Sequence, residues 1–166
     1  MAGRNPVDVS VSLEGFDALS AALRAEEDGK QLRKDLAKGM RDALKPASDQ
    51  AKSGIMSMSA AMTEAPALRS AIAKKIRPEV KLGGRWSGAR VKARKTPGIR
   101  GFANAAKRTQ AAGGWRVQIF GRGTWRTQQG KTDWFDRAMD PGSPRYRQAV
   151  HEAMEAMARR IADRAR

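Results

Sequence analysis

The chain has 166 residues, of which 40% are hydrophobic and 30% charged, a balance typical of one folded domain rather than of a disordered chain. It contains no Cys and one His, His151, which excludes disulfide scaffolds, Cys nucleophiles, thiolate metal sites and metal sites built from several His side chains. The formal net charge of +16 predicts a polyanionic partner, an acidic protein surface, or neutralisation inside an assembly.

The N-terminal part predicts a strand followed by helices. Apolar and polar residues alternate over 7–14, which indicates a half-buried strand that ends at Gly15. Phe16, Leu19 and Leu23 then recur at helical spacing and predict a short helix.

A longer helical pattern runs from Gln31 to Gly54. Its apolar face consists of Leu32, Leu36, Met40, Leu44, Ala47 and Ala51. Pro46 interrupts the pattern because proline donates no backbone hydrogen bond and crowds the preceding turn. Since the apolar face continues beyond it, we expect one long helix with a kink.

The middle of the chain predicts shorter elements. We expect a loop over 55–65, a helix that starts at Pro66 and is stopped by Pro78, and short strands near 80–82 and 89–93. Residues 95–114 show no clear period apart from a helical turn around 103–112.

The C-terminal part predicts a hairpin and a closing helix. Trp115, Val117 and Ile119 form an alternating strand pattern, and the glycines at 121 and 123 indicate a turn into a second strand over 124–127. We expect a loop over 128–140 and an amphipathic helix from Ser143 to about residue 165. The fold class is then α+β, with a small antiparallel sheet packed against the long kinked helix and the C-terminal helix in a single domain, 1–166.

The positive charge is concentrated in one segment. Between Lys74 and Lys131 the chain has 16 Lys and Arg residues against one acid, whereas the remainder has 17 basic and 16 acidic residues. Within this segment we expect 85–114 to be a flexible, basic, glycine-rich insert. The residues predicted to contact a polyanion or an acidic partner are Lys92, Arg94, Lys95, Arg100, Lys107 and Arg108. A solvated basic face is an equally good interpretation of these six residues.

Three features that suggest chemistry have simpler explanations. The stretch 130–132, Gly-Lys-Thr, lacks the glycine that a phosphate-binding loop needs five residues earlier, where Trp125 stands. His151 has no obvious acid–base partner, and the aspartates at 133, 136 and 140 lack the spacing of a calcium loop. We therefore expect no catalytic residues, no metal and no cofactor.

Two aromatic residues, Trp134 and Phe135, are expected to anchor the last loop. They would pack against either the core or a neighbouring subunit, and core packing is the favoured interpretation. The four Trp residues lie in or beside the basic segment, and this mixture is found at nucleic-acid surfaces and at protein interfaces alike.

Several motifs in this order resemble the tail-completion and head–tail joining (neck) proteins of tailed bacteriophages. The resemblance covers most of the chain. It rests on Leu13-Glu14-Gly15-Phe16 after the first strand, the Lys- and Ala-rich helix Gln31 to Gly54, Leu68-Arg69-Ser70-Ala71-Ile72, Asp133-Trp134-Phe135-Asp136-Arg137-Ala138, and the closing amphipathic helix. The family usually has Gly before the Leu-Arg pair, where this chain has Ala67.

The resemblance implies a structural protein of the virion without a catalytic site. Its members form an oligomeric ring between the portal-side connector or head-closure protein and the tail terminator or tail tube. The resemblance thus implies three kinds of partner: copies of the chain itself, these neighbouring proteins, and the genomic DNA in the lumen. It also implies synthesis in the cytoplasm of the bacterial host and a final location at the head–tail junction.

Two other function classes remain. A basic nucleic-acid-binding module explains the charge, although the basic residues are spread over strands and loops rather than on one reading helix. A small nuclease is a poorer candidate because there is a single His and no metal-ligand cluster. No apolar run approaches the roughly 18 residues of a membrane span, and the polar start has no features of a secretory signal, so we expect a soluble protein.

Overall fold

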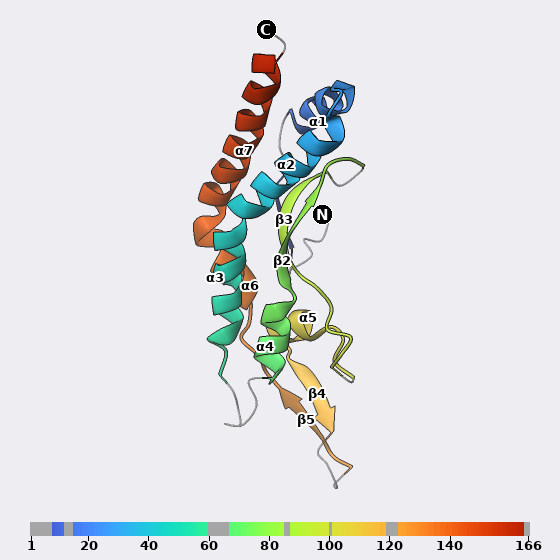
Figure 1. Ribbon diagram of the computed structural model, residues 1–166. Coiled ribbons are helices and arrows are strands. Elements are labelled where there is room, and N and C mark those ends of the chain that lie inside the picture. The colour runs from blue at the N-terminus through green and yellow to red at the C-terminus, as the bar shows by residue number, and fades with distance from the viewer. Residues whose placement is uncertain are drawn as a thin grey trace. The chain divides into compact units, whose positions relative to one another are not determined.

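The computed structural model describes residues 8–11, 15–59, 67–84, 87–99, 101–118 and 123–164 (Figure 1). It confirms the α+β class. The chain forms two compact units, each of which is described by itself below. Unit 1 comprises 1–8, 49–77 and 92–141, and unit 2 comprises 9–48, 78–91 and 142–166.

Three helices dominate unit 2. They are α1 (Phe16–Ala25), α2 (Gly29–Ala43) and α7 (Ser143–Arg164). Helix α2 lies along α7, and α1 packs against both (Figure 1). Their buried faces carry Leu23, Leu32, Leu36, Met40, Val150, Met154 and Met157. These positions recur at helical spacing, so the apolar stripe of each helix accounts for the packing.

The long helix expected over 31–54 is two helices. Helix α2 ends at Ala43, Leu44 forms a turn with φ −92° and ψ −1°, and α3 (Lys45–Met56) follows. Pro46 is the second residue of α3, in the first turn, where its missing backbone donor costs nothing. Because buried Leu44 and Ala47 keep the apolar face continuous across the turn, the sequence pattern did not show the break.

A three-stranded sheet has the strand order β1-β3-β2. The strands are β1 (Asp8–Val11), β2 (Ile76–Lys81) and β3 (Gly88–Ala93). The expectation that Pro78 stops a helix is wrong, since α4 (Ala67–Lys74) ends before it and Pro78 lies within β2. Strand β2 is at the edge of the sheet and pairs with β3 on one side only, and edge strands are where prolines are tolerated in sheets.

Besides α4 and most of α3, unit 1 contains a hairpin and two shorter helices. The hairpin pairs β4 (Trp115–Gln118) with β5 (Trp125–Gln128) in antiparallel register, with Trp115 opposite Gln128. The helices are α5 (Ala105–Gln110) and α6 (Trp134–Met139), and a 3₁₀ turn, Asp140–Gly142, leads on to α7. The sequence predicted this hairpin. The expectation of a loop over 128–140 is wrong for Trp134–Met139, which form α6.

Helix α6 is held by two buried polar side chains of α5. The indole Nε1–H of Trp134 donates to Thr109 Oγ1 at 3.2 Å, and the backbone N–H of Phe135 donates to Gln110 Oε1 at 3.0 Å. The Gln110 amide nitrogen also donates to Asp136 Oδ2 at 3.0 Å. These bonds satisfy groups that would be costly to bury alone. The same bonds account for the formation of α6, which has only six residues and is too short to show a helical period in the sequence.

Gly130 allows the chain to pass close to α5. A Cβ atom at this position would lie 2.1 Å from the backbone oxygen of Thr109. Only a residue without a side chain fits there. The glycine of the Gly-Lys-Thr stretch at 130–132 therefore has a packing role.

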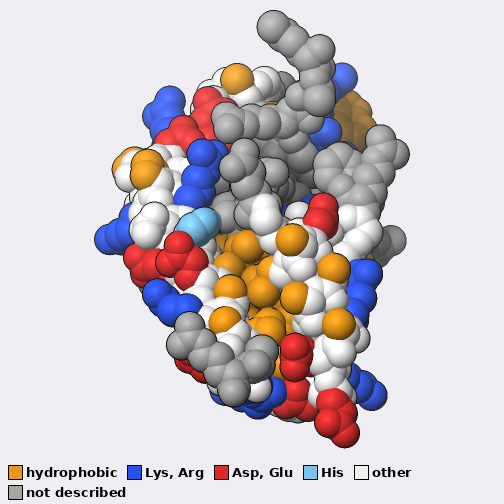
Figure 2. Space-filling view, turned by 90° about the horizontal axis from the view of Figure 1, so that it is seen from above, with side chains coloured by type: hydrophobic (Ala, Val, Ile, Leu, Met, Phe, Trp, Pro, Cys, Tyr) orange, Lys and Arg blue, Asp and Glu red, His pale blue; other side chains and the backbone are white. Residues whose placement is uncertain are grey.

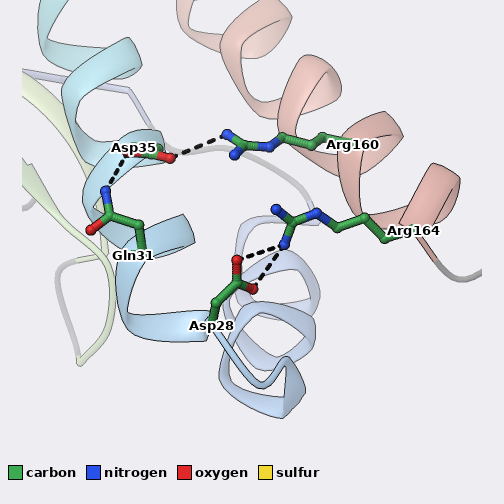
Figure 3. Close-up of polar contacts among 5 residues, drawn as sticks. All are labelled: Asp28, Gln31, Asp35, Arg160 and Arg164. Atoms are coloured by element: carbon green, nitrogen blue, oxygen red, sulfur yellow. Dashed lines mark hydrogen bonds and ion pairs between the residues drawn. The ribbon is translucent and has the colours of Figure 1, made fainter.

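Charged side chains tie the end of α7 to the start of α2 (Figure 3). Arg164 Nη1 donates to both carboxylate oxygens of Asp28, at 2.8 and 2.7 Å, and Arg160 Nη1 donates to Asp35 Oδ2 at 3.1 Å. The hydrogen bond from Arg164 is the main cause that lowers the pKa of Asp28 below its ordinary value. Both pairs are exposed, so they orient the helix ends more than they stabilise the fold.

The surface is mixed in character. Seen from above Figure 1, hydrophobic side chains gather in the middle of one face, and acidic and basic side chains flank them (Figure 2). None of the helices described here is long and apolar enough to cross a membrane.

Candidate functional site

Four of the six predicted contact residues come together in unit 1. They are Lys92, Arg94, Lys95 and Lys107, and they line one pocket of about 560 Å³. Ala93, Asn104 and Ala106 complete the lining, which contains no acidic residue. The arrangement places four basic residues around one concave surface.

The lining of the pocket comes from two stretches of the chain. Residues 92–95 lie at and beyond the end of β3, and Asn104, Ala106 and Lys107 lie at the start of α5. Between them the chain makes a closed loop that is pinned by Thr96. Its backbone N–H donates to Ala103 O at 2.7 Å, and its hydroxyl donates to Phe102 O at 2.8 Å. Thr96 itself is 2% exposed, and its hydroxyl bond to Phe102 is part-buried.

The end of β3 is also attached to α4. The Arg94 backbone N–H donates to Lys75 O at 3.0 Å, and α4 contacts α5. The side chains of Lys74 and Lys75 are exposed. A further basic residue, Lys75, is thus bonded through its backbone to a residue of the pocket lining.

The lysine side chains of the pocket are available to a ligand. Within the described part of the chain, Lys92, Lys95 and Lys107 make no side-chain hydrogen bond or ion pair. Asn104 occupies the N-cap position of α5, yet its side chain makes no capping hydrogen bond. Three lysines and one asparagine of the lining thus have side chains without a hydrogen-bond or ion-pair partner among the described residues, whereas Arg94 has an interaction of its own.

The other two predicted contact residues do not line the pocket. Arg108 places its guanidinium 5.3 Å from the ring centre of Phe102, a cation–π contact on α5. Phe102 in turn lies 5.2 Å from the ring of Trp115. Arg100 lies outside the described residues.

Trp134 and Phe135 are buried in unit 1. They are 1% and 0% exposed, and their rings meet edge to face with centres 5.6 Å apart. The structure therefore places both in a core rather than on a surface.

Sequence reasoning missed Asn104 as a pocket residue. Its position just before a short apolar and basic stretch is typical of a helix N-cap, and that signal would have placed it at the start of α5. Its presence beside 92–95 depends on the closure of the loop at Thr96, which no local pattern shows. The segment 85–114, expected as a flexible insert, contains β3 and α5, and both bury alanine side chains.

The ribbon formed by β4 and β5 is a second candidate surface. All four residues of β5 are exposed, and β4 alternates between half-buried and exposed residues. Trp125 is 55% exposed, and Arg116 of the facing strand lies 5.5 Å from its ring centre. The ribbon therefore presents an aromatic side chain and most of one strand at the surface of unit 1.

The remaining candidate residues have local roles. His151 Nδ1 lies 3.2 Å from Glu155 Oε1, one turn along α7, and both side chains are exposed. Lys131 Nζ donates to Ser57 Oγ at 2.7 Å. Among the described residues no group of three His, Asp or Glu side chains is placed to hold a metal ion.

Comparison of the chain with protein-family models, with curated proteins and with solved structures gave no match.

Proposed function

We propose that the chain is a structural virion protein of a tailed bacteriophage, which assembles with copies of itself into part of a ring at the head–tail junction. Its role is mechanical joining or tail completion rather than catalysis. Its neighbours are a portal-side connector or head-closure protein and a tail terminator or tail-tube protein.

The order of elements supports this proposal. Strand β1 is followed by the four helices α1 to α4, then by β2 and β3, α5, the β4–β5 hairpin, α6 and the long α7. The motif resemblance implies a first strand, a long helical segment, a short helix, a strand pair, an aromatic segment and a closing helix, and elements of these kinds occur in this order.

The observation that carries the proposal is the exposed β4–β5 ribbon. Its strands pair only with each other, so each has one edge whose backbone groups no other described strand uses. Such edges add readily to another chain. A ring needs a surface on each copy that fits a different surface on the next, and a projecting ribbon meets that need.

The mass of the purified protein in solution tests the proposal. Light scattering is expected to show a discrete oligomer at high protein concentration. Trp125→Ala is expected to weaken association by about 2 kcal/mol or more, which corresponds to roughly a 30-fold higher dissociation constant, because exposed Trp residues are typical interface hot spots.

Met56→Ala is the matched control. Met56 is 41% exposed, lies on α3 outside the ribbon, and is the other large hydrophobic residue exposed among those described. It is expected to leave the oligomer unchanged. A wild-type protein that stays monomeric at every concentration, or a Trp125→Ala oligomer as stable as wild type, would contradict the role given to the ribbon.

A further inference from the structure

We propose that the outer edge of β5 in one copy of the chain pairs with the outer edge of β1 in the next copy, so that a sheet continues across the contact. The inference rests on the proposed function and deepens it, because it names the surface of the second copy that receives the ribbon. Three properties of the described strands lead to this pairing: which edges are unpaired, which residues obstruct them, and what charge they carry.

Strand β5 provides the accessible edge of the ribbon. All four of its residues are exposed, and among the described strands it pairs only with β4. Strand β4 is less accessible, since Trp115 and Val117 are half-buried and the Trp115 ring lies 5.2 Å from that of Phe102. Neither proline nor lysine, which commonly protect an exposed edge, occurs in β5. Its free backbone groups can therefore pair with an extended strand.

The other described strands leave one edge suited to receive β5. Strand β3 lies between β1 and β2 and is paired on both sides. Strand β2 is an edge, but it contains Pro78, which lacks a backbone donor, and the exposed basic residues Arg77 and Lys81. Strand β1, with the sequence Asp-Val-Ser-Val, is the opposite edge and contains neither proline nor a basic residue. Among the described strands, β1 is thus the edge that fits.

The charges of the two strands are complementary. The sequence from 115 to 128 contains three arginines and no acidic residue, and Arg126 of β5 is exposed. The sequence from 5 to 23 contains three acidic residues, the first of which is Asp8 of β1, and no lysine or arginine. Opposite charges on neighbouring strands stabilise their pairing. Because the net charge of +16 opposes contact between copies in general, a local match of this kind is needed.

The same charges argue against a contact between two ribbons. Two β5 strands brought together would place two copies of Arg126 near each other, and like charges on neighbouring strands are destabilising. Such a contact uses the same surface on both copies and closes as a dimer. Pairing β5 with β1 uses two different surfaces, so each copy gives one edge and receives another. Repetition of this contact produces a ring when the rotation between copies closes.

Disulfide trapping between differently substituted copies tests the pairing. The chain contains no Cys, so every bridge joins introduced residues. One protein carries Val9→Cys or Ser10→Cys in β1. The other, distinguished by a mass tag, carries Thr127→Cys or Gln128→Cys in β5. Neighbouring positions are used because successive residues of a strand point to opposite faces.

Mild oxidation of the mixed oligomer is expected to produce a covalent dimer that contains one tagged and one untagged copy. A bridge requires Cβ atoms about 3.5–4.5 Å apart, a separation reached by adjacent strands. The matched control places the cysteine at the other edge of the three-stranded sheet. Lys81→Cys, at the exposed end of β2, is expected to give no such dimer with Thr127→Cys.

Exchange of charges tests the pairing without dependence on its register. Arg126→Glu alone and Asp8→Lys alone are each expected to raise the dissociation constant of the oligomer about tenfold, because each change places like charges across the contact. A chain that carries both changes is expected to return to within about threefold of wild type. Arg137→Glu is the matched control, since Arg137 is an exposed arginine of α6 outside the ribbon, and it is expected to leave association unchanged. Circular dichroism of each variant verifies that it has folded.

Light scattering of the same samples separates the two proposals. In a protein that forms an oligomer, three results would overturn the strand pairing and leave the proposed function standing. They are the absence of a bridge in all four cysteine combinations, an equal yield of bridge with Lys81→Cys, and a doubly exchanged chain that associates no better than the single variants. A wild-type protein that is monomeric at every concentration would overturn both.

Discussion

Thr109 and Gln110 show how single polar side chains determine local structure in unit 1. Both are buried, and both use their side chains to hold the start of α6. The Thr109 hydroxyl accepts from Trp134 while donating to Ala105 O at 2.9 Å. Each atom in this small network has a partner, which is the condition for burying polar groups without large cost.

Replacing Thr109 by Val is expected to lower the free energy of unfolding by about 1–3 kcal/mol, because the buried indole N–H of Trp134 loses its acceptor. In a Trp134→Phe background that donor is absent, so the same change is expected to cost less. Urea unfolding followed by circular dichroism measures the four proteins of this double-mutant cycle. Equal costs of Thr109→Val in the two backgrounds would show that the two side chains are not coupled.

Gly130→Ala is expected to destabilise the protein by about 1–3 kcal/mol, the usual cost of forcing extra volume into a packed site. The added Cβ would meet the backbone of Thr109, which has no freedom to move aside. Gly98→Ala is the matched control, since a Cβ at Gly98 has no neighbour within 4 Å, and its effect is expected to stay within about 0.5 kcal/mol. Thermal unfolding of the two variants, compared with wild type, decides whether Gly130 is needed for packing.

At the scale of elements, the end of α7 is joined to α2 by ion pairs. Asp28 occupies the N-cap position of α2 but makes no capping bond there, and its carboxylate binds Arg164 instead. Because this interaction lowers the pKa of Asp28, the stabilisation is fully present above the unfolded carboxyl pKa of about 4 and is lost as the pH falls through the lower folded value.

Acidification below about pH 4 is therefore expected to loosen the last turns of α7. Amide hydrogen exchange over 160–164, corrected for the intrinsic rate, is expected to speed up in wild type over this range. Asp28→Asn is expected to show the faster exchange already at neutral pH. Asp42→Asn is the control. The pKa of Asp42 is also lowered, but its partner is Lys45, three residues further along the chain, and not a residue of α7. Identical pH profiles for wild type and Asp28→Asn would contradict the assignment.

Elements with a strong period were predictable from the sequence, and those that depend on distant contacts were not. Helix α7 and strand β3 agree with their patterns, since Val150 and Met154 repeat at helical spacing and Ala89 and Val91 alternate. Helix α6 was missed because it has six residues and relies on side chains of α5.

The pocket, too, was predictable in part from the sequence pattern and depends in part on contacts between residues far apart in the chain. Its basic residues were predicted from charge alone, without knowledge that Lys92 and Lys107 line the same pocket. Their meeting depends on the hydrogen bonds of Thr96, and Asn104 joins them for the same reason. The charge pattern thus predicted four of the lining residues, while loop closure determines how they are arranged.

At the scale of the whole molecule, the basic segment of the sequence does not coincide with either of the two compact units. The basic excess lies between Lys74 and Lys131, yet the structure divides this segment between unit 1 and the 78–91 part of unit 2. A single domain was expected, and the structure contains two compact units whose contacts join parts of the chain far apart in sequence. The basic pocket and the candidate assembly ribbon both belong to unit 1.

The most direct test of the central proposal is the location of the protein in assembled particles. Gold-labelled antibody against the chain, viewed by electron microscopy on tailed particles produced from the genome that encodes it, is expected to mark the head–tail junction. Complete, infectious particles from which the protein is absent, or label confined to some other part of the particle, would contradict the account.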